Sequence, residues 1–205
     1  MIEILLISFF SYLSGSIPFG LILTKFLGGK DIRKIGSGNI GATNVLRTGN
    51  KFLAISTLVL DIVKGYTPVV ITQSYFPEYT QLAALLAFLG HIFPFWLKFK
   101  GGKGVATYLG ILFALSYSLG FLFIFTWVAV SLIFRYSSLS SMFSSLTVLV
   151  VTFFRENVLM SIDPNFSFQD NIKLILFFFF ILIFFTHRKN IKRLKNKEET
   201  KTKIY

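Results

Sequence analysis

Cysteine is absent from this chain of 205 residues, which excludes disulfide bonds, thiolate zinc sites and a cysteine nucleophile. Histidine is nearly absent, because only His91 and His187 occur, on different hydrophobic segments, so we expect neither a metal site nor a cofactor. Charged residues are also scarce, at 15% of the chain against about 25% in soluble domains. Uncharged apolar runs are frequent instead, and the run at 177–185 suits a lipid bilayer better than a small soluble core.

Seven hydrophobic segments are candidates for membrane-spanning helices. They cover residues 3–26, 53–75, 81–97, 105–117, 119–134, 140–155 and 171–187. A helix needs about 20 residues to cross the hydrocarbon core, so the third and fourth segments are short. The stretch 105–134 therefore has two interpretations, one long tilted helix or two helices broken at 116–120.

The distribution of positive charge favours two helices there. With seven spans, eighteen of the twenty-one lysines and arginines fall on one side of the membrane, as cytoplasmic loops require. We therefore predict an all-α polytopic membrane protein of seven transmembrane helices, with its N-terminus outside and its C-terminus in the cytoplasm. Residues 1–187 form a single transmembrane domain in this prediction, with an outer loop at 156–170. Residues 188–205 form a basic cytoplasmic tail that we expect to be frayed.

The net charge of +12 indicates anionic partners. Because the basic residues lie at the ends of apolar segments, we expect them to face anionic lipid at the inner membrane surface and anionic substrates. Nucleic acid is not an expected partner.

The first motif is the glycine-rich segment 36–47, whose small residues allow backbone N–H groups to converge on a phosphate. Arg47 adds a guanidinium group, which can bind a phosphate through two N–H groups. The candidate substrate-binding residues here are Ser37, Gly38, Asn39, Gly41, Ala42, Thr43 and Asn44. The segment also matches a dinucleotide-binding fingerprint, but no strand or βαβ unit accompanies it. The alternative is a flexible connecting loop.

The second motif, Asp61 to Gly65, lies inside the predicted span 53–75. Asp61 and Lys64 are three residues apart, share a helix face and can form an ion pair. Charges within a span usually face a bundle interior or a wet cavity. We favour a supporting role for this pair over direct substrate contact, and a purely structural pair is the alternative.

The third motif runs from Gly90 to Thr107 and contains a lysine among three glycines, directly before a predicted helix. It is not a Walker A loop, because no Ser or Thr follows Lys103. We predict a functional role for Lys103, a supporting role for His91, and membrane anchoring for Lys98 and Lys100. The glycines predicted to line this site are Gly101, Gly102 and Gly104.

Two further clusters flank the last spans. The serines at 137–141 either bind phosphate or cap a helix, and we select Ser138, Ser140 and Ser141. His187 and Asn190 lie in a basic cluster after the last span, where basic residues usually anchor a helix to anionic lipid. These two residues are not explained by anchoring.

In order and spacing, these motifs resemble the bacterial acyl-phosphate:glycerol-3-phosphate acyltransferase family over about residues 10–193. The resemblance implies a seven-helix enzyme of the bacterial inner membrane whose active site faces the cytoplasm. It implies transfer of a fatty acyl group from acyl phosphate to the 1-hydroxyl of glycerol 3-phosphate, giving lysophosphatidic acid and phosphate for phospholipid synthesis. By similarity, Arg47, Lys103, His187, Asn190 and a serine of 137–141 hold glycerol 3-phosphate, and the first-motif loop binds the donor's phosphate.

The implied chemistry suits the residues. An acyl phosphate is already activated, so the protein needs mainly to hold two anions together and neutralise them. The His and Asp spacing of acyl-CoA-dependent enzymes is missing, since the fifth residue after His91 is Trp96. The soluble enzyme that makes acyl phosphate is a candidate partner. The alternative function is a phosphate or organic-anion transporter, which basic loops and a pair of Asp61 and Lys64 within a span would also suit.

Overall fold

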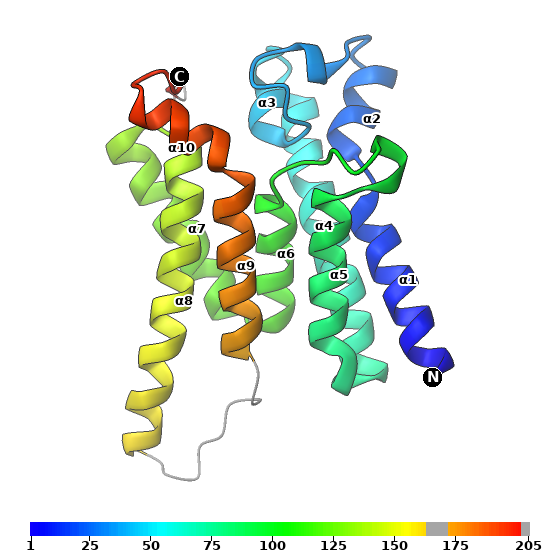
Figure 1. Cartoon of the computed structure of the whole chain (residues 1–205), viewed down its shortest axis with the longest axis vertical. Helices are drawn as coiled ribbons and strands as arrows, with labels where there is room; N and C mark the ends of the chain where they lie inside the picture. The colour runs from blue at the N-terminus through cyan, green and yellow to red at the C-terminus, as the bar shows by residue number, and fades with distance from the viewer. Residues whose placement is uncertain (163–171, 202–205) are drawn as a thin grey trace. The chain divides into compact units, whose positions relative to one another are not determined.

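The computed structural model describes residues 1–162 and 172–201 (Figure 1), and every regular element in these two ranges is a helix. The chain divides into two compact units, Met1–Tyr117 and Ser118–Tyr205. The predicted outer loop at 156–170 is wrong for residues 156–162, which are helical. Residues 163–170 of that loop and the end of the tail lie outside the described residues.

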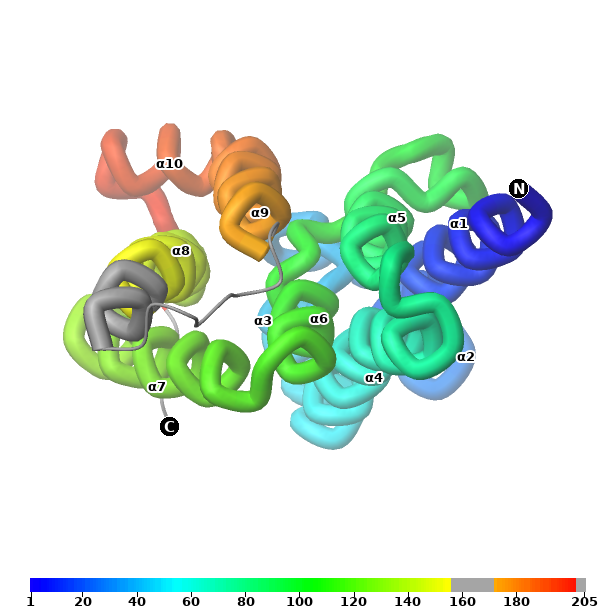
Figure 2. The backbone as a smooth tube through the Cα atoms, turned by 90° about the horizontal axis from the view of Figure 1, so that it is seen from below, coloured from blue at the N-terminus to red at the C-terminus, as the bar shows by residue number. Residues whose placement is uncertain are grey.

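The first unit is built around one long helix, α4, and carries six α-helices in its described residues. They are α1 (Ile2–Ser16), α2 (Phe19–Phe26), α3 (Ala42–Leu46), α4 (Lys51–Tyr75), α5 (Thr80–Ile92) and α6 (Val105–Leu115), with short 3₁₀ turns at Ile32–Lys34, Pro77–Tyr79 and Phe95–Leu97. Figure 2 shows α4 beside α5 and α6, and α4 packs against both of these helices and against α1.

Glycines allow these helices to approach one another closely. A Cβ atom at Gly15 of α1 would meet the backbone of Ala87 in α5, and one at Gly110 of α6 would meet the backbone of Ile62 in α4. Small residues at helix contacts are typical of membrane bundles, in which van der Waals packing replaces the hydrophobic driving force. The first unit is therefore a tightly packed frame for the loops at its ends.

The predicted span 3–26 is broken into α1 and α2, which meet at an angle of 43°. The break lies at Ile17, whose backbone is extended, immediately before Pro18. Proline disfavours the helical conformation in the residue that precedes it, which explains the position of the break. A single straight helix over 3–26 is thus not formed.

The second unit consists of α7 (Tyr117–Phe134), α8 (Ser137–Ile162), α9 (Ile172–Thr186) and α10 (Arg188–Lys195). Helix α8 packs against α9, and α10 leaves α9 at an angle of 56°. The prediction that the tail 188–205 is frayed is wrong for its first part, because residues 188–195 are helical and Glu199 is held by three side chains described below.

Most of the predicted spans coincide with helices. The break expected within 105–134 lies at Ser116, between α6 and α7. Within residues 1–162 and 172–201, four helices can cross a membrane by length and composition, and six can if each bent pair, α1 with α2 and α9 with α10, forms one span. Helix α6 is a shorter apolar helix of 11 residues. The count of seven spans and the orientation of the termini stay predictions.

Candidate functional site

The first-motif loop joins α2 to α4 and is organised by one buried side chain, Asn44. Its Oδ1 atom accepts a hydrogen bond from the backbone N–H of Ser37 at 3.0 Å. Its Nδ2 atom donates to the carbonyl oxygens of Ile32, Ile35 and Asn39, at 3.1, 2.9 and 2.8 Å. A freely flexible connecting loop does not fit these bonds. Because both polar atoms of Asn44 are engaged, its geometry favours holding the loop over binding a ligand.

Arg47 lies next to this loop with its side chain over Gly36. A Cβ atom at Gly36 would lie 2.7 Å from Arg47 Cδ and 3.0 Å from Nη1. The guanidinium group is exposed and has no hydrogen bond or ion pair within 1–162 or 172–201. Ser37 and Gly38 are exposed beside it. Arg47 is thus placed to accept an anion together with the exposed part of the loop.

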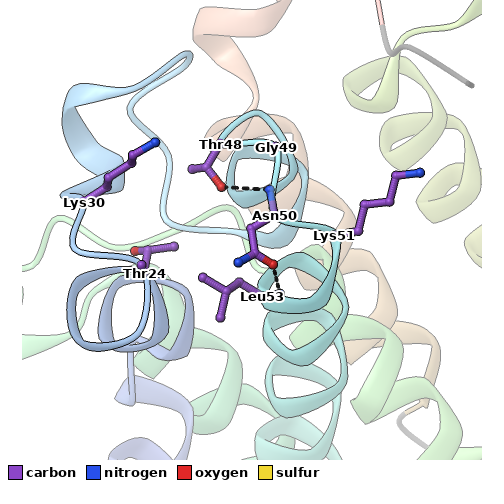
Figure 3. Close-up of a pocket in the computed structure, with 8 residues that line it drawn as sticks. Thr24, Lys30, Thr48, Gly49, Asn50, Lys51 and Leu53 are labelled. Atoms are coloured by element: carbon purple, nitrogen blue, oxygen red, sulfur yellow. Dashed lines mark hydrogen bonds between the residues drawn. The ribbon is translucent and has the colours of Figure 1, made fainter.

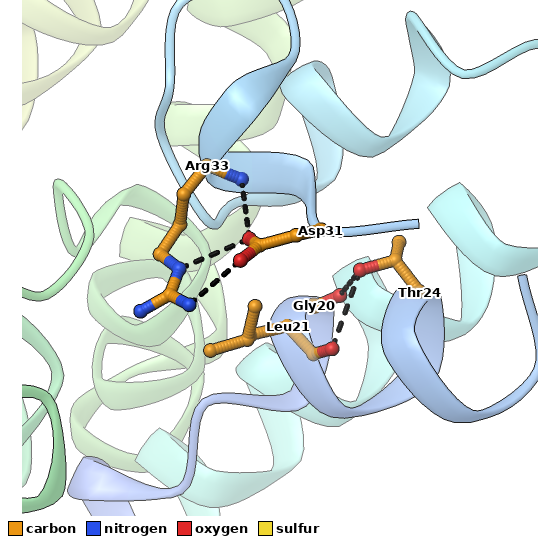
Figure 4. A network of polar contacts seen from close by, with 5 residues as sticks. All are labelled: Gly20, Leu21, Thr24, Asp31 and Arg33. Carbon is orange, nitrogen blue, oxygen red and sulfur yellow. Dashed lines mark hydrogen bonds and ion pairs between the residues drawn. The ribbon is translucent and has the colours of Figure 1, made fainter. Parts of the chain in front are cut away.

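A second arginine near the loop is already paired. Arg33 contacts the carboxylate of Asp31 through Nε at 3.0 Å and Nη2 at 2.7 Å (Figure 4). The side-chain hydrogen bond from Arg33 is the main cause that lowers the pKa of Asp31 to about 2. The sequence did not indicate this pair, which makes Arg33 a poorer candidate for substrate binding than Arg47.

The predicted pair in α4 is formed and buried. Lys64 Nζ lies 2.7 Å from Asp61 Oδ1, and the two side chains are 2% and 3% exposed. Lys64 Nζ also donates to the carbonyl oxygen of Ile17 at 2.6 Å, where α1 ends. This arrangement supports the structural role of the pair.

The third-motif loop is fastened to the end of α5. The N–H groups of Gly101 and Gly102 donate to the carbonyl oxygens of Ile92 and His91 at 3.0 and 3.1 Å. Gly104 then precedes α6 with a left-handed backbone, φ 82°. Lys103 is half-buried, whereas Lys98 and Lys100 are exposed. Burial therefore distinguishes Lys103 from Lys98 and Lys100.

The two loops of the first unit lie at the same end of it, opposite the N-terminus (Figure 1). A buried cluster of Ile32, Ile40, Val45 and Leu53 supports the first loop, and Leu97 of the third motif packs against that cluster. The first and third motifs therefore contact each other through this cluster.

Two cavities of the first unit are lined mainly by residues outside these motifs. One, of about 670 Å³, lies beside the start of α4 and is lined by Thr24, Lys30, Thr48 and Lys51 (Figure 3). The other, of about 660 Å³, is an apolar groove along α1 and α4 that includes Trp96 and Lys64. Apart from Lys64, the predicted site residues do not line either cavity.

In the second unit, Ser138 and Asn190 meet at one carboxylate. Glu199 Oε1 accepts hydrogen bonds from Ser138 Oγ at 2.9 Å and Asn190 Nδ2 at 2.5 Å, and Oε2 accepts one from Arg193 Nε at 2.6 Å. Burial acts to raise the pKa of Glu199, but these three hydrogen bonds outweigh it, and the pKa lies below its ordinary value. Sequence reasoning missed Glu199, and its only signal was an acidic residue in a basic tail.

The remaining predicted residues of the second unit make hydrogen bonds to backbone carbonyl oxygens close to them in the sequence. Ser140 Oγ and Ser141 Oγ donate to the carbonyl oxygens of Tyr136 and Ser137, and Trp127 Nε1 donates to Ser141 Oγ at 3.2 Å. His187 is 1% exposed, with Nδ1 2.8 Å from the carbonyl oxygen of Ile183. Because a carbonyl oxygen only accepts, Nδ1 carries the proton of this bond.

Together the apolar helices, the close glycine contacts and the cationic loops are those of an all-helical integral membrane protein. Residues 5–197 match the family model described as glycerol-3-phosphate acyltransferase. The chain belongs to this family.

Curated relatives agree with the family model. The glycerol-3-phosphate acyltransferase of Pelagibacter ubique (strain HTCC1062) is 56% identical over 99% of this chain and 100% of its own length. That of Mesorhizobium japonicum is 49% identical over 90% of this chain and 89% of its own length.

The fold is also similar to a crystal structure of PlsY (YgiH), an integral membrane glycerol 3-phosphate acyltransferase, in its glycerol 3-phosphate form. The TM-score is 0.88 at 34% identity, covering 98% of this chain and 96% of that one. A second form of the same protein, with lysophosphatidic acid, gives a TM-score of 0.86. This chain is therefore an integral membrane acyltransferase that acts on glycerol 3-phosphate in phospholipid synthesis, and the transporter alternative is not favoured.

Proposed function

We propose that the acyl donor is acyl phosphate and that the products are lysophosphatidic acid and inorganic phosphate. The observation that carries this proposal is the pair of cationic loops at one end of the first unit, one presenting Arg47 and the other Lys103. Both substrates of such a reaction carry a phosphate group, and cations with backbone N–H groups are the usual partners of phosphate.

The proposed reaction needs no protein nucleophile. The 1-hydroxyl oxygen of glycerol 3-phosphate attacks the acyl carbonyl carbon, and the bond from that carbon to the phosphate oxygen then breaks. The hydroxyl proton ends on a phosphate group. Positive groups held near the two phosphates reduce their repulsion and stabilise the leaving phosphate.

We assign the donor's phosphate to the loop residues Ser37 to Thr43, with Asn44 holding their shape. We propose that Arg47 and Lys103 of the first unit bind glycerol 3-phosphate. For the second unit, taken by itself, we propose substrate-binding roles for His187, Asn190 and the serines at 138–141. The hydrogen bonds to Glu199 hold the side chains of Ser138 and Asn190 in place. The proposed setting is the bacterial inner membrane, with seven spans, the N-terminus outside and the active site facing the cytoplasm.

The test is a comparison of donors with the purified full-length chain and glycerol 3-phosphate. We expect lysophosphatidic acid with acyl phosphate and none with acyl-CoA or acyl carrier protein. Equal product from acyl-CoA would refute the donor assignment, and no product with any donor from folded protein would refute the function.

A matched pair of lysines tests the role of the third motif. Lys103→Gln is expected to lose about 2 kcal/mol or more of transition-state stabilisation, because a phosphate loses its counter-charge. Lys100→Gln, at an exposed position of the same loop, is expected to retain most activity. Equal losses in both would contradict the assignment of Lys103.

A further inference from the structure

His91 touches the third-motif loop on both sides of Lys103. Its carbonyl oxygen accepts the hydrogen bond from the N–H of Gly102, and its ring atom Nδ1 lies 3.0 Å from Thr107 Oγ1 in the first turn of α6. The residue is 4% exposed. Lys103 therefore lies between two points of the chain that are both held by one buried histidine.

The imidazole ring also fills the space beside Gly102. A Cβ atom added to Gly102 would meet Nε2 of the ring, with Cε1 at 3.0 Å and Cδ2 at 3.1 Å as the next nearest atoms. The backbone of Gly102 does not adopt a left-handed φ, so the ring is the reason that a side chain does not fit there. The ring edge thus sets the path of the chain at the residue directly before Lys103.

A loop with three glycines needs such a support if it is to present a lysine in one place. Glycine loses more conformational freedom on ordering than other residues, and the cost of ordering a loop on binding weakens affinity for the ligand. The hydrogen bonds of Gly101 and Gly102 and the ring contact order the loop before any ligand binds. Phe88 adds to this support, because its ring lies against Gly104.

We propose that His91 is a positioning residue that holds Lys103 where it binds the phosphate of glycerol 3-phosphate, without itself touching substrate. This inference rests on the proposed function. It makes the ring edge of His91, rather than its ability to exchange a proton, the feature on which substrate affinity depends.

A double-mutant cycle between His91 and Gly102 tests the contact. Asparagine at 91 keeps a polar atom at the position of Nδ1 for Thr107 but lacks Nε2 and Cε1. We expect His91→Asn to raise KM for glycerol 3-phosphate about tenfold, with a smaller change in kcat, because uniform binding is what is lost. We expect the single variant Gly102→Ala to raise KM more than His91→Asn does. We expect the double variant to have a lower KM than Gly102→Ala alone, because the added methyl group occupies the space left by the ring.

Thr107→Val separates the hydrogen bond from the ring contact and is expected to raise KM by less than His91→Asn. The matched control is Thr152→Val. Thr152 is also a buried threonine, but its hydroxyl donates to a carbonyl oxygen of its own helix, so this variant is expected to leave KM unchanged. Thermal unfolding of each variant, with and without glycerol 3-phosphate, gives a second measurement, in which His91→Asn is expected to show a reduced stabilisation by substrate.

A wild-type KM in His91→Asn, or effects of His91→Asn and Gly102→Ala that simply add, would overturn the positioning role. If His91→Asn does not fold, the double variant and Thr107→Val test the positioning role instead. A wild-type KM in both of these variants would overturn that role. Absence of product from the wild-type chain would instead refute the proposed function.

Discussion

Lys64 donates a hydrogen bond from its ammonium group to the carbonyl oxygen of Ile17, 2.6 Å away, at the point where α1 ends and the chain turns into α2. The same ammonium group pairs with Asp61 and lies 5.7 Å from the centre of the Phe19 ring. A lysine at a helix C-terminus satisfies a carbonyl that has no partner within the helix. The buried pair therefore fixes the break that directs α2 towards the first-motif loop.

Removing one partner of this pair is expected to destabilise the protein strongly. Lys64→Met leaves Asp61 buried without its counter-charge and leaves the carbonyl of Ile17 without a donor, at a cost of about 3–5 kcal/mol. The double variant Asp61→Leu with Lys64→Met is expected to be more stable than Lys64→Met alone, since no buried charge remains. Thermal unfolding in detergent measures both, and a double variant that is less stable than the single one would contradict the explanation.

The sequence predicted those features that depend on composition and local order. Uncharged runs located the helices, and the distribution of positive charge favoured the break between α6 and α7. Pro18 carried an equally local signal for the break after α1, which we did not use. The glycine-rich motifs indicated the two loops of the first unit.

Local sequence patterns did not predict the contacts between segments that are far apart in the chain. Asn44 looked like a ligand-binding residue because its side chain is polar and lies in a glycine-rich segment, but its hydrogen bonds run back to Ile32 and Ile35. Glu199 was indistinguishable from other charges in the tail until the fold brought it to Ser138, 61 residues earlier. Pairings of this kind depend on tertiary structure.

Asn44 is expected to be essential for the shape of the first-motif loop. Asn44→Ala removes four hydrogen bonds of a residue that is 2% exposed, and we expect a loss of about 2–4 kcal/mol. Asn44→Asp keeps the size of the side chain but cannot donate hydrogen bonds, so we expect it to lose nearly as much activity as Asn44→Ala. Activity and thermal unfolding check both, with Asn50→Ala, a helix-cap variant with an expected cost of about 1 kcal/mol, as the control. Wild-type activity in Asn44→Asp would contradict this role.

Gly36 is expected to tolerate no side chain, because Arg47 lies over it. Gly36 has φ 55°, and a Cβ atom there would lie 2.5 Å from Asn44 Oδ1 and 2.7 Å from Arg47 Cδ. Gly36→Ala should therefore displace Arg47 and lower activity about a hundredfold. Gly49→Ala is the matched control, because Gly49 has φ 86° and open space around the position of its Cβ atom. Both variants bear backbone strain of about 1–2 kcal/mol, so equal losses of activity would show that strain rather than displacement of Arg47 is responsible.

Glu199 is expected to make the stability of the second unit depend on pH. Its pKa is lowered in the folded chain relative to the ordinary value of 4.5, so the folded state favours the charged carboxylate. The stabilisation is therefore fully present above about pH 4.5 and is lost as the pH falls through the lower pKa of the folded state. The melting temperature of the wild-type chain should fall over this window.

The Glu199→Gln variant isolates that contribution. Its uncharged amide gives weaker hydrogen bonds to Asn190 and Arg193, so the melting temperature should be lower than that of the wild type at pH 7 and should change less between pH 6 and the lowest pH that the protein tolerates. Glu198→Gln, at the exposed neighbouring position, should keep the pH dependence of the wild type. If Glu199→Gln and the wild type showed parallel curves, the conclusion that the Glu199 carboxylate stabilises the arrangement of Ser138 and Asn190 would be wrong.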